Sequence, residues 1–132
     1  MDEPLSSLDA KLRSDLRIEL KSIQADSGAT MLYVTHDQTE AMTMATHVGV
    51  LDDGKLVQFG SPREIYEDPV SIYAASRLGQ PRINVLPSDV FGGAPDKATH
   101  IGLRPEQIMQ GEGEDSFVQR VEHLGDQTRL HL

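Results

Sequence analysis

A β-rich run and a helix start meet in residues 30–44, which read TMLYVTHDQTEAMTM. Residues 30–35 are rich in strand formers and show no clean alternation of apolar and polar side chains, as expected for a strand that is covered on both faces. Asp37, with Glu40 three residues later, has the spacing that caps a helix through the end of the segment. The segment therefore predicts a central parallel strand that leads into His36, followed directly by a short helix.

An amphipathic helix is predicted before this strand. Its apolar stripe recurs at helical spacing and comprises Leu8, Leu12, Leu16, Leu20 and Ile23. The spacing of Ser6 and Asp9 predicts a capping box at its start, and Ser27-Gly28 signals its end. The order helix, strand, helix is typical of an α/β fold with a parallel sheet.

Residues 47–78 carry clear boundary signals for a hairpin and two helices. The predicted elements are strands at His47–Leu51 and Leu56–Phe59, a helix that begins after Ser61 and ends before Asp68-Pro69, and a helix from Val70 to Leu78. The sequence Asp-Asp-Gly-Lys at 52–55 is a strong hairpin turn, so the two strands should pair. Pro62 suits a first helical position, and Glu64 completes a capping box with Ser61.

The sequence changes in character after Pro81, because helical periods vanish and glycine and proline interrupt short apolar runs. Predicted strands follow at Ile83–Leu86, Thr99–Leu103, Phe117–Leu124 and Gln127–Leu132, the last two as a hairpin. We place a domain boundary near Gln80, which divides the chain into residues 1–80 and 81–132. A few short strands leave an unpaired sheet edge, so the second module looks incomplete. Residues 111–115, GEGED, predict a solvated acidic loop.

The composition limits the possible classes of protein. The chain has 132 residues, of which 38% are apolar and 25% charged, and its net charge is −9. This acidity makes nucleic acid and anionic lipid poor candidate partners. No apolar run approaches the roughly 18 residues that a membrane-spanning helix needs, and no secretory signal is recognisable. Cysteine is absent, which excludes disulfides and thiolate metal sites. We expect a cytosolic protein of one domain or two small ones.

Two places in the sequence could carry chemistry. Asp2-Glu3 precedes a predicted helix, and adjacent carboxylates there can divide the binding of a hard cation from proton transfer. His36 follows the predicted parallel strand, at the edge where open α/β sheets bind ligands. Each pattern alone has a simpler explanation, since acidic residues before a helix ordinarily interact with its dipole and a histidine can hydrogen-bond a neighbouring loop. The residues around each pattern therefore decide its meaning.

Both patterns lie within longer motifs. Residues 2–9, DEPLSSLD, resemble the end of the Walker B strand and the D-loop of ABC-transporter ATPases, and residues 33–42, YVTHDQTEAM, resemble their H-loop. Residues 54–66, GKLVQFGSPREIY, look like importer ATPases that serve sugars, glycerol phosphate, polyamines and similar solutes. Residues 102–106 and 121–125 are similar to the carboxy-terminal regulatory module of the maltose-type ATPases. The resemblance covers nearly the whole chain.

This resemblance implies a fold. Residues 1–80 would be the carboxy-terminal part of a RecA-like ABC ATPase domain, and residues 81–132 would be part of an OB-like (TOBE-type) β-barrel regulatory module. Arg104 precedes a proline in the second module. A functional role is conceivable for it, but the interpretation that we favour is that it braces the barrel.

The resemblance also implies site residues and partners. Asp2 would help to hold Mg²⁺, Glu3 would polarise the attacking water as general base, and His36 would contact the γ-phosphate of ATP. Asp9, in the D-loop, would reach toward the nucleotide of a second ATPase subunit in a homodimer. The membrane subunits of the transporter would place the protein at the inner face of the cell membrane. The solute is not encoded here, because the family's substrate choice lies in other subunits.

Two motifs of these ATPases are missing from the sequence. There is no G-x-x-x-x-G-K-[ST] loop, whose backbone amides and lysine cradle the phosphates, and no Leu-Ser-Gly-Gly-Gln signature. The chain thus resembles an ATPase truncated at its amino end, with ATP and Mg²⁺ bound by the full-length parent and no activity of its own. The alternative is a stand-alone regulatory or interaction module without catalysis.

We predict that the isolated chain neither binds ATP tightly nor hydrolyses it. A triphosphate with magnesium needs donors that converge on its oxygens, whereas this chain offers mainly the carboxylates of Asp2, Glu3 and Asp9 and a net charge of −9. Isothermal titration of the purified chain with magnesium ATP should show no saturable heat. A micromolar dissociation constant together with phosphate release would overturn this prediction.

Overall fold

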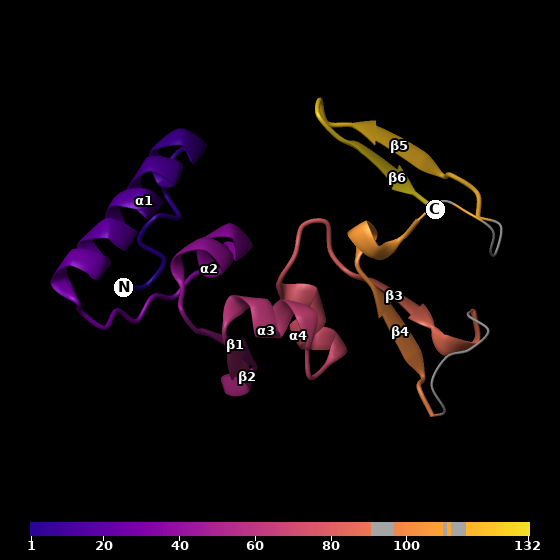
Figure 1. The fold of residues 1–132 in the computed structure, drawn as a ribbon, viewed down its shortest axis with the longest axis horizontal. Helices are drawn as coiled ribbons and strands as arrows, with labels where there is room; N and C mark the ends of the chain where they lie inside the picture. Colours follow the sequence, from indigo (N-terminus) through magenta and orange to yellow (C-terminus); the bar gives the residue numbers. More distant parts are fainter. Residues whose placement is uncertain (91–96, 110, 112–115) are drawn as a thin grey trace.

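The computed structural model describes residues 1–90, 97–109, 111 and 116–132. Its helices are α1 (Ala10–Ser27), α2 (Gln38–Met44), α3 (Pro62–Glu67) and α4 (Ile72–Arg77) (Figure 1). Its strands are β1 (Val48–Asp52), β2 (Lys55–Gly60), β3 (Asn84–Pro87), β4 (His100–Leu103), β5 (Arg120–His123) and β6 (Thr128–His131). Two short 3-10 helices are η1 (Ser88–Val90) and η2 (Pro105–Gln107). The predicted acidic loop lies, apart from Gly111, outside the described residues.

Helix α1 begins later than the capping box at Ser6 predicted. The carboxylate of Asp9 accepts hydrogen bonds from two backbone N–H groups of the first turn, at 3.1 and 3.0 Å, so Asp9 is the N-cap. Ser6 lies in a turn before the helix, and its hydroxyl donates to the carbonyl of Glu3 instead. The predicted end is confirmed, because Gly28 caps the helix in the left-handed conformation, with a φ of 62°.

The apolar stripe of α1 does not form a core. No residue of this helix is buried, and the stripe residues Leu12 and Ile23 are 43% and 48% exposed. Figure 1 shows α1 at one end of the molecule with α2 beside it, and α2 is the element with which it shares most contacts. Leu8, Leu16 and Leu20 are half-buried, so the stripe is only partly covered within the part of the chain that the structure describes.

Residues 30–35 do not form the predicted central strand. Their one element of regular structure is a parallel bridge that joins Val34 to Asp2. Val34 donates its N–H to the carbonyl of Met1 and accepts from the N–H of Glu3, both at 2.9 Å. The parallel direction agrees with the prediction, but the burial does not, since Leu32 is 82% exposed. Among the described residues, only residues 1–3 pair with this segment. A strand is buried on both faces only when other elements pack against each face.

A small core forms where the β1–β2 hairpin meets α3 and α4. Its buried centre is Val50, Ile65 and Leu78. The predicted hairpin turn is confirmed, and Asp53 and Gly54 adopt positive φ values of 45° and 73°, as a two-residue type I′ turn requires. The capping box predicted at the start of α3 is also present. Local turn and cap signals thus position the elements that bury this core.

The second part of the chain contains two further antiparallel hairpins. β3 pairs with β4, and β5 pairs with β6 around the predicted turn at Gly125. The six described strands form three separate two-stranded sheets. No closed barrel forms among the described residues, so the predicted OB-like barrel is not confirmed. Isolated hairpins close a barrel only when further strand pairs join their edges.

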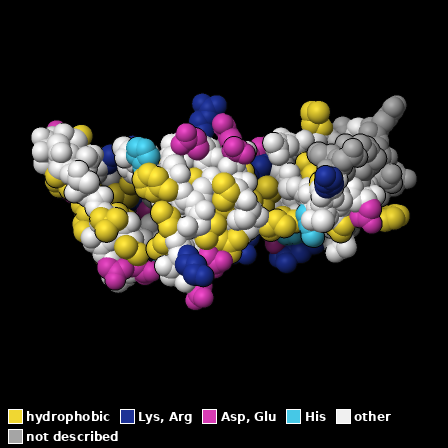
Figure 2. All heavy atoms as spheres, turned by 90° about the horizontal axis from the view of Figure 1, so that it is seen from below, with side chains coloured by type: hydrophobic (Ala, Val, Ile, Leu, Met, Phe, Trp, Pro, Cys, Tyr) yellow, Lys and Arg dark blue, Asp and Glu magenta, His cyan; other side chains and the backbone are white. Residues whose placement is uncertain are grey.

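Apolar side chains reach the surface on several elements besides α1. Figure 2 shows them across much of the face that it presents. Exposed examples on the β1–β2 hairpin are Leu51, Leu56 and Phe59, at 60%, 59% and 65%. None of the helices in the described ranges is both long and apolar enough to cross a membrane.

Arg104 joins the second hairpin region to α3 and α4. Arg104 lies 26 residues after Leu78 in the sequence. Its side chain nevertheless donates to the carbonyl of Leu78 at 2.7 Å and to the carbonyl of Tyr66 at 3.0 Å. The guanidinium also stacks on the Tyr66 ring, 3.9 Å from its centroid, and the residue is only 4% exposed. Gly79 permits this approach, because a Cβ there would lie 2.8 Å from the guanidinium. Arg104 is therefore a structural brace, although not of a closed barrel, and the boundary near Gln80 stays a prediction.

We predict that Arg104→Met lowers the free energy of unfolding by about 2 to 4 kcal/mol, because two carbonyls and an aromatic face lose a charged, buried partner. The control is Arg63→Met, which removes a largely exposed pair with Glu67 on α3 and should cost less than about 0.5 kcal/mol. Urea titration followed by circular dichroism measures both. Equal midpoints for the two variants would contradict the role of Arg104.

Candidate functional site

The parallel bridge brings Glu3 and His36 together. Glu3 follows Asp2 in the bridge, and His36 lies two residues after Val34 on the other side. The Glu3 carboxylate oxygen Oε1 lies 2.9 Å from Nδ1 of His36, although 33 residues separate the two. Glu3 adopts a φ of 41°, which is uncommon for a residue with a side chain. Two residues that the sequence placed in different motifs thus form one exposed pair.

The electrostatics of this pair favour a protonated imidazole. The hydrogen bond with Glu3, reinforced by the charge of that carboxylate, raises the pKa of His36 above its usual value near 6.5. Because an ionised carboxylate only accepts hydrogen bonds, Nδ1 of His36 is the donor to Glu3. The side chain of His36 is 74% exposed and that of Glu3 is 43% exposed. The pair is therefore accessible to a molecule that approaches from solution.

Asp9 and Asp2, the other two predicted site residues, make different contacts. The Asp9 carboxylate caps α1, so its hydrogen-bonding capacity is partly used by the helix. Asp2 takes part in the bridge through its backbone. Within the described ranges, no group of three or more histidine, aspartate or glutamate side chains could hold a metal ion. Mg²⁺ requires an octahedral set of oxygens, and Asp2 supplies one carboxylate toward it, so the described residues do not complete a magnesium site.

A buried polar cluster lies beside His36. Glu40 on α2 is only 3% exposed, and its Oε2 atom accepts hydrogen bonds from the Tyr33 hydroxyl at 3.0 Å and from the Thr35 hydroxyl at 2.6 Å. The Thr35 hydroxyl also accepts from the backbone N–H of Asp37, at 3.0 Å. Our sequence reasoning missed this cluster. Tyr33 and Thr35 are two residues apart, so an extended backbone places both on the same face, and that spacing was the available signal.

Asp37 connects the cluster to α1. Its carboxylate caps α2 through the N–H groups of Thr39 and Glu40, at 2.7 and 3.3 Å, and it pairs with Arg13 at 3.3 Å. Burial alone would raise the pKa of Asp37, but these hydrogen bonds outweigh it and lower the pKa below its usual value. The residue that follows His36 is thus held as an anion between two helices.

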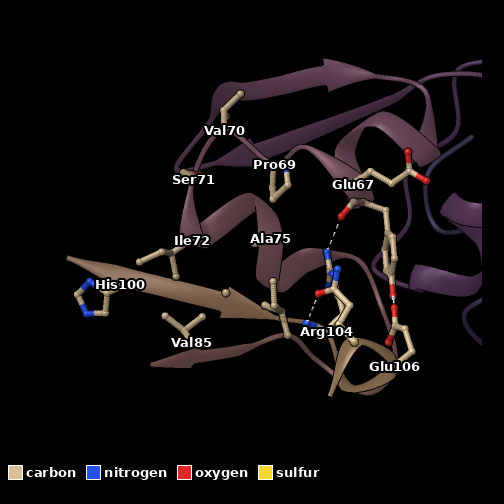
Figure 3. A pocket seen from close by; sticks show the side chains of 14 residues that line it. Glu67, Pro69, Val70, Ser71, Ile72, Ala75, Val85, His100, Arg104 and Glu106 are labelled. Carbon is tan, nitrogen blue, oxygen red and sulfur yellow. Dashed lines mark hydrogen bonds between the residues drawn. The ribbon is translucent and has the colours of Figure 1, made fainter. Parts of the chain in front are cut away.

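A separate cavity of about 550 Å³ lies between α3, α4 and the β3–β4 hairpin. Figure 3 shows Arg104 and Glu106 at one end of it, with Val85 and His100 contributed by the strands. Asp2, Glu3 and His36 do not line this cavity. This cavity is therefore separate from the site that the sequence indicated.

We predict that Tyr33 ionises far above the usual tyrosine range. Burial, followed by the hydrogen bond to Glu40, raises its pKa to about 12. An unfolded tyrosine releases its proton near pH 10, so the folded chain should lose stability as the pH rises from about 10 to about 12. Ultraviolet titration of the chain and of Tyr33→Phe isolates this ionisation. Glu40→Gln should lower the pKa of Tyr33, and an unchanged pKa would contradict the hydrogen bond.

Comparison with known proteins reveals extensive similarity to import ATP-binding proteins. The chain is 40% identical to the sn-glycerol-3-phosphate import ATP-binding protein UgpC 2 of Rhizobium johnstonii, over 99% of its own length and 41% of the relative. It is 42% identical to the xylose/arabinose import ATP-binding protein XacK of Haloferax volcanii, over 100% and 41% of the two chains. For the maltose/maltodextrin import ATP-binding protein MalK of Escherichia coli, the identity is 36% over 100% and 44%.

No family model matches the chain. The chain spans about two fifths of the length of the curated relatives that it matches. The alignments extend over essentially all residues of this chain, so the similarity is not confined to a few short motifs. Over essentially its whole length, the chain is homologous to the ATP-binding subunits of ABC importers.

Proposed function

We propose that this chain is the carboxy-terminal part of an importer ATPase subunit, which couples ATP hydrolysis to the uptake of a sugar or a related solute. The observation that carries the proposal is the 2.9 Å contact between Glu3 and His36 at the parallel bridge. In this proposal Glu3 is the general base that polarises the attacking water, and His36 contacts the γ-phosphate.

The geometry of the pair suits these two roles. Glu3 and His36 follow the two backbone segments of a parallel bridge, and in open α/β sheets the carboxyl ends of parallel strands face the ligand. A carboxylate can accept a proton from water, and an imidazole whose pKa is raised keeps its proton more readily and can donate to a phosphate. Both side chains are exposed enough to meet a nucleotide bound by another part of the protein.

The remaining assignments follow from the family. Asp2 would help to hold Mg²⁺ together with ATP, which supplies the phosphoryl group for transfer, and both would be bound by the full-length protein. Asp9 would belong to the D-loop that faces a second ATPase subunit. Because Asp9 is the N-cap of α1, the loop ends at the first turn of this helix. We propose residues 1–80 as the ATPase part and residues 81–132 as part of an OB-like regulatory module.

The proposed partners are a second copy of the ATPase subunit and the membrane subunits of a transporter, at the inner face of the cell membrane. The printed names of the relatives include sn-glycerol-3-phosphate, xylose, arabinose, maltose and maltodextrin as imported solutes. These names support a polyhydroxylated solute for this protein. They do not select one among them.

The genomic sequence before Met1 provides the first experiment. If the proposal is correct, the reading frame continues upstream and encodes a G-x-x-x-x-G-K-[ST] loop and a Leu-Ser-Gly-Gly-Gln signature. A start signal at Met1 with neither motif upstream would instead favour the stand-alone regulatory or interaction module.

In the full-length ATPase, we predict that Glu3→Gln and His36→Ala each lower the turnover of ATP at least about 10²-fold while nucleotide binding stays nearly intact, because each removes an interaction made in the transition state. Glu19→Gln on the exposed side of α1 and His123→Ala on β5 are matched controls that should keep the wild-type rate. Steady-state phosphate release and equilibrium binding of a fluorescent ATP analogue measure the two quantities. Rates near wild type for both site variants would reject the assignment.

A further inference from the structure

We propose that Thr35, anchored by Glu40, is a positioning residue that holds the turn on which His36 is presented. This inference rests on the proposed function and assigns a role to side chains outside the Glu3–His36 pair. Thr35 and Asp37 flank His36 directly, and one hydroxyl connects both of them to the start of α2.

The Thr35 hydroxyl makes two hydrogen bonds on opposite sides of His36. It donates to Glu40 Oε2 at 2.6 Å and accepts from the backbone N–H of Asp37 at 3.0 Å. The first bond fixes the residue before the histidine to a side chain of α2. The second bond fixes the residue after it. The backbone on both sides of His36 is therefore tied to one atom.

Glu40 is a buried anchor for the Thr35 hydroxyl. Its residue is 3% exposed, and burial of a carboxylate is costly unless donors satisfy it. Tyr33 and Thr35 are the donors, and both bind the same oxygen. Tyr33 therefore supports Glu40 from the same extended segment that leads into His36. The anchor itself lies within α2, whose start is capped by Asp37.

The imidazole of His36 has little other support. Its side chain is 74% exposed, and its ring contacts Glu3, the residue with which it would act. An exposed side chain keeps a fixed position only if its backbone is held, since it lacks packing around it. The turn at Thr35 thus decides where Nδ1 meets Glu3. An error of about 1 Å in such a position can lower a catalytic rate about 10²-fold.

The test uses the full-length ATPase that contains this chain. Thr35→Val removes the hydroxyl and keeps the branched shape, and it should lower kcat at least about tenfold while the KM for ATP changes less than about twofold. Thr35→Ser restores the hydroxyl and should recover most of the rate. The control is Thr43→Val on α2, because the Thr43 hydroxyl also makes a 2.6 Å hydrogen bond, but to the carbonyl of Thr39. That variant should stay within about twofold of wild type.

A double variant separates positioning from general stability. If Thr35 acts through His36, Thr35→Val should cause no further loss of kcat in a His36→Ala background. A full additional loss there, or a wild-type kcat for Thr35→Val itself, would overturn the inference. If His36→Ala alone keeps the wild-type rate, the proposed function fails at its own site, and the inference falls with it.

A second variant covers the case in which Thr35→Val does not fold. Tyr33→Phe removes one of the two donors to Glu40 and leaves Thr35 untouched. We expect a loss of kcat of about two- to fivefold that disappears in the His36→Ala background. Circular dichroism establishes that each variant is folded. A folded Tyr33→Phe enzyme with a wild-type kcat, or with the same loss in both backgrounds, would overturn the role of Glu40 as the anchor.

Discussion

The parallel pairing of the first three residues with Val34 is the constraint on which the candidate site depends. Two backbone hydrogen bonds of 2.9 Å hold these segments side by side. They bring Glu3 within 2.9 Å of His36, although neither side chain is buried. Backbone pairing, rather than side-chain packing, thus positions Glu3 and His36, because hydrogen bonds in a bridge fix the register of the residues that follow it.

A second, independent constraint holds the other half of the chain. Arg104 satisfies two carbonyls and covers an aromatic ring, so one side chain joins the β3–β4 region to α3 and α4. A buried guanidinium is tolerated where its donors meet acceptors. The carbonyls of Leu78 and Tyr66 accept from Nη1 and Nη2, whereas Nε has no partner among the described residues. The bridge and this brace act on different segments. The small core around Ile65 lies between them in the sequence.

Local elements were predicted well because their signals lie within a few residues. The hairpin turn at Asp53-Gly54 and the capping box at Ser61 depend on side chains that contact their own neighbours in the chain. Asp9 shows the limit of such signals. Ser6 and Asp9 both suit an N-cap, and the sequence pattern did not show that a turn precedes the helix.

The sequence by itself determined the family motifs, the caps and the turns, because each is a property of neighbouring residues. It also placed Glu3 and His36 as site candidates, through their motifs. Only the tertiary structure decided what is buried and which segments meet. No residue of the α1 stripe is buried, residues 30–35 form one bridge, and the described strands close no barrel. Burial depends on layers that come from distant parts of a chain, and periodicity records only that a face is apolar.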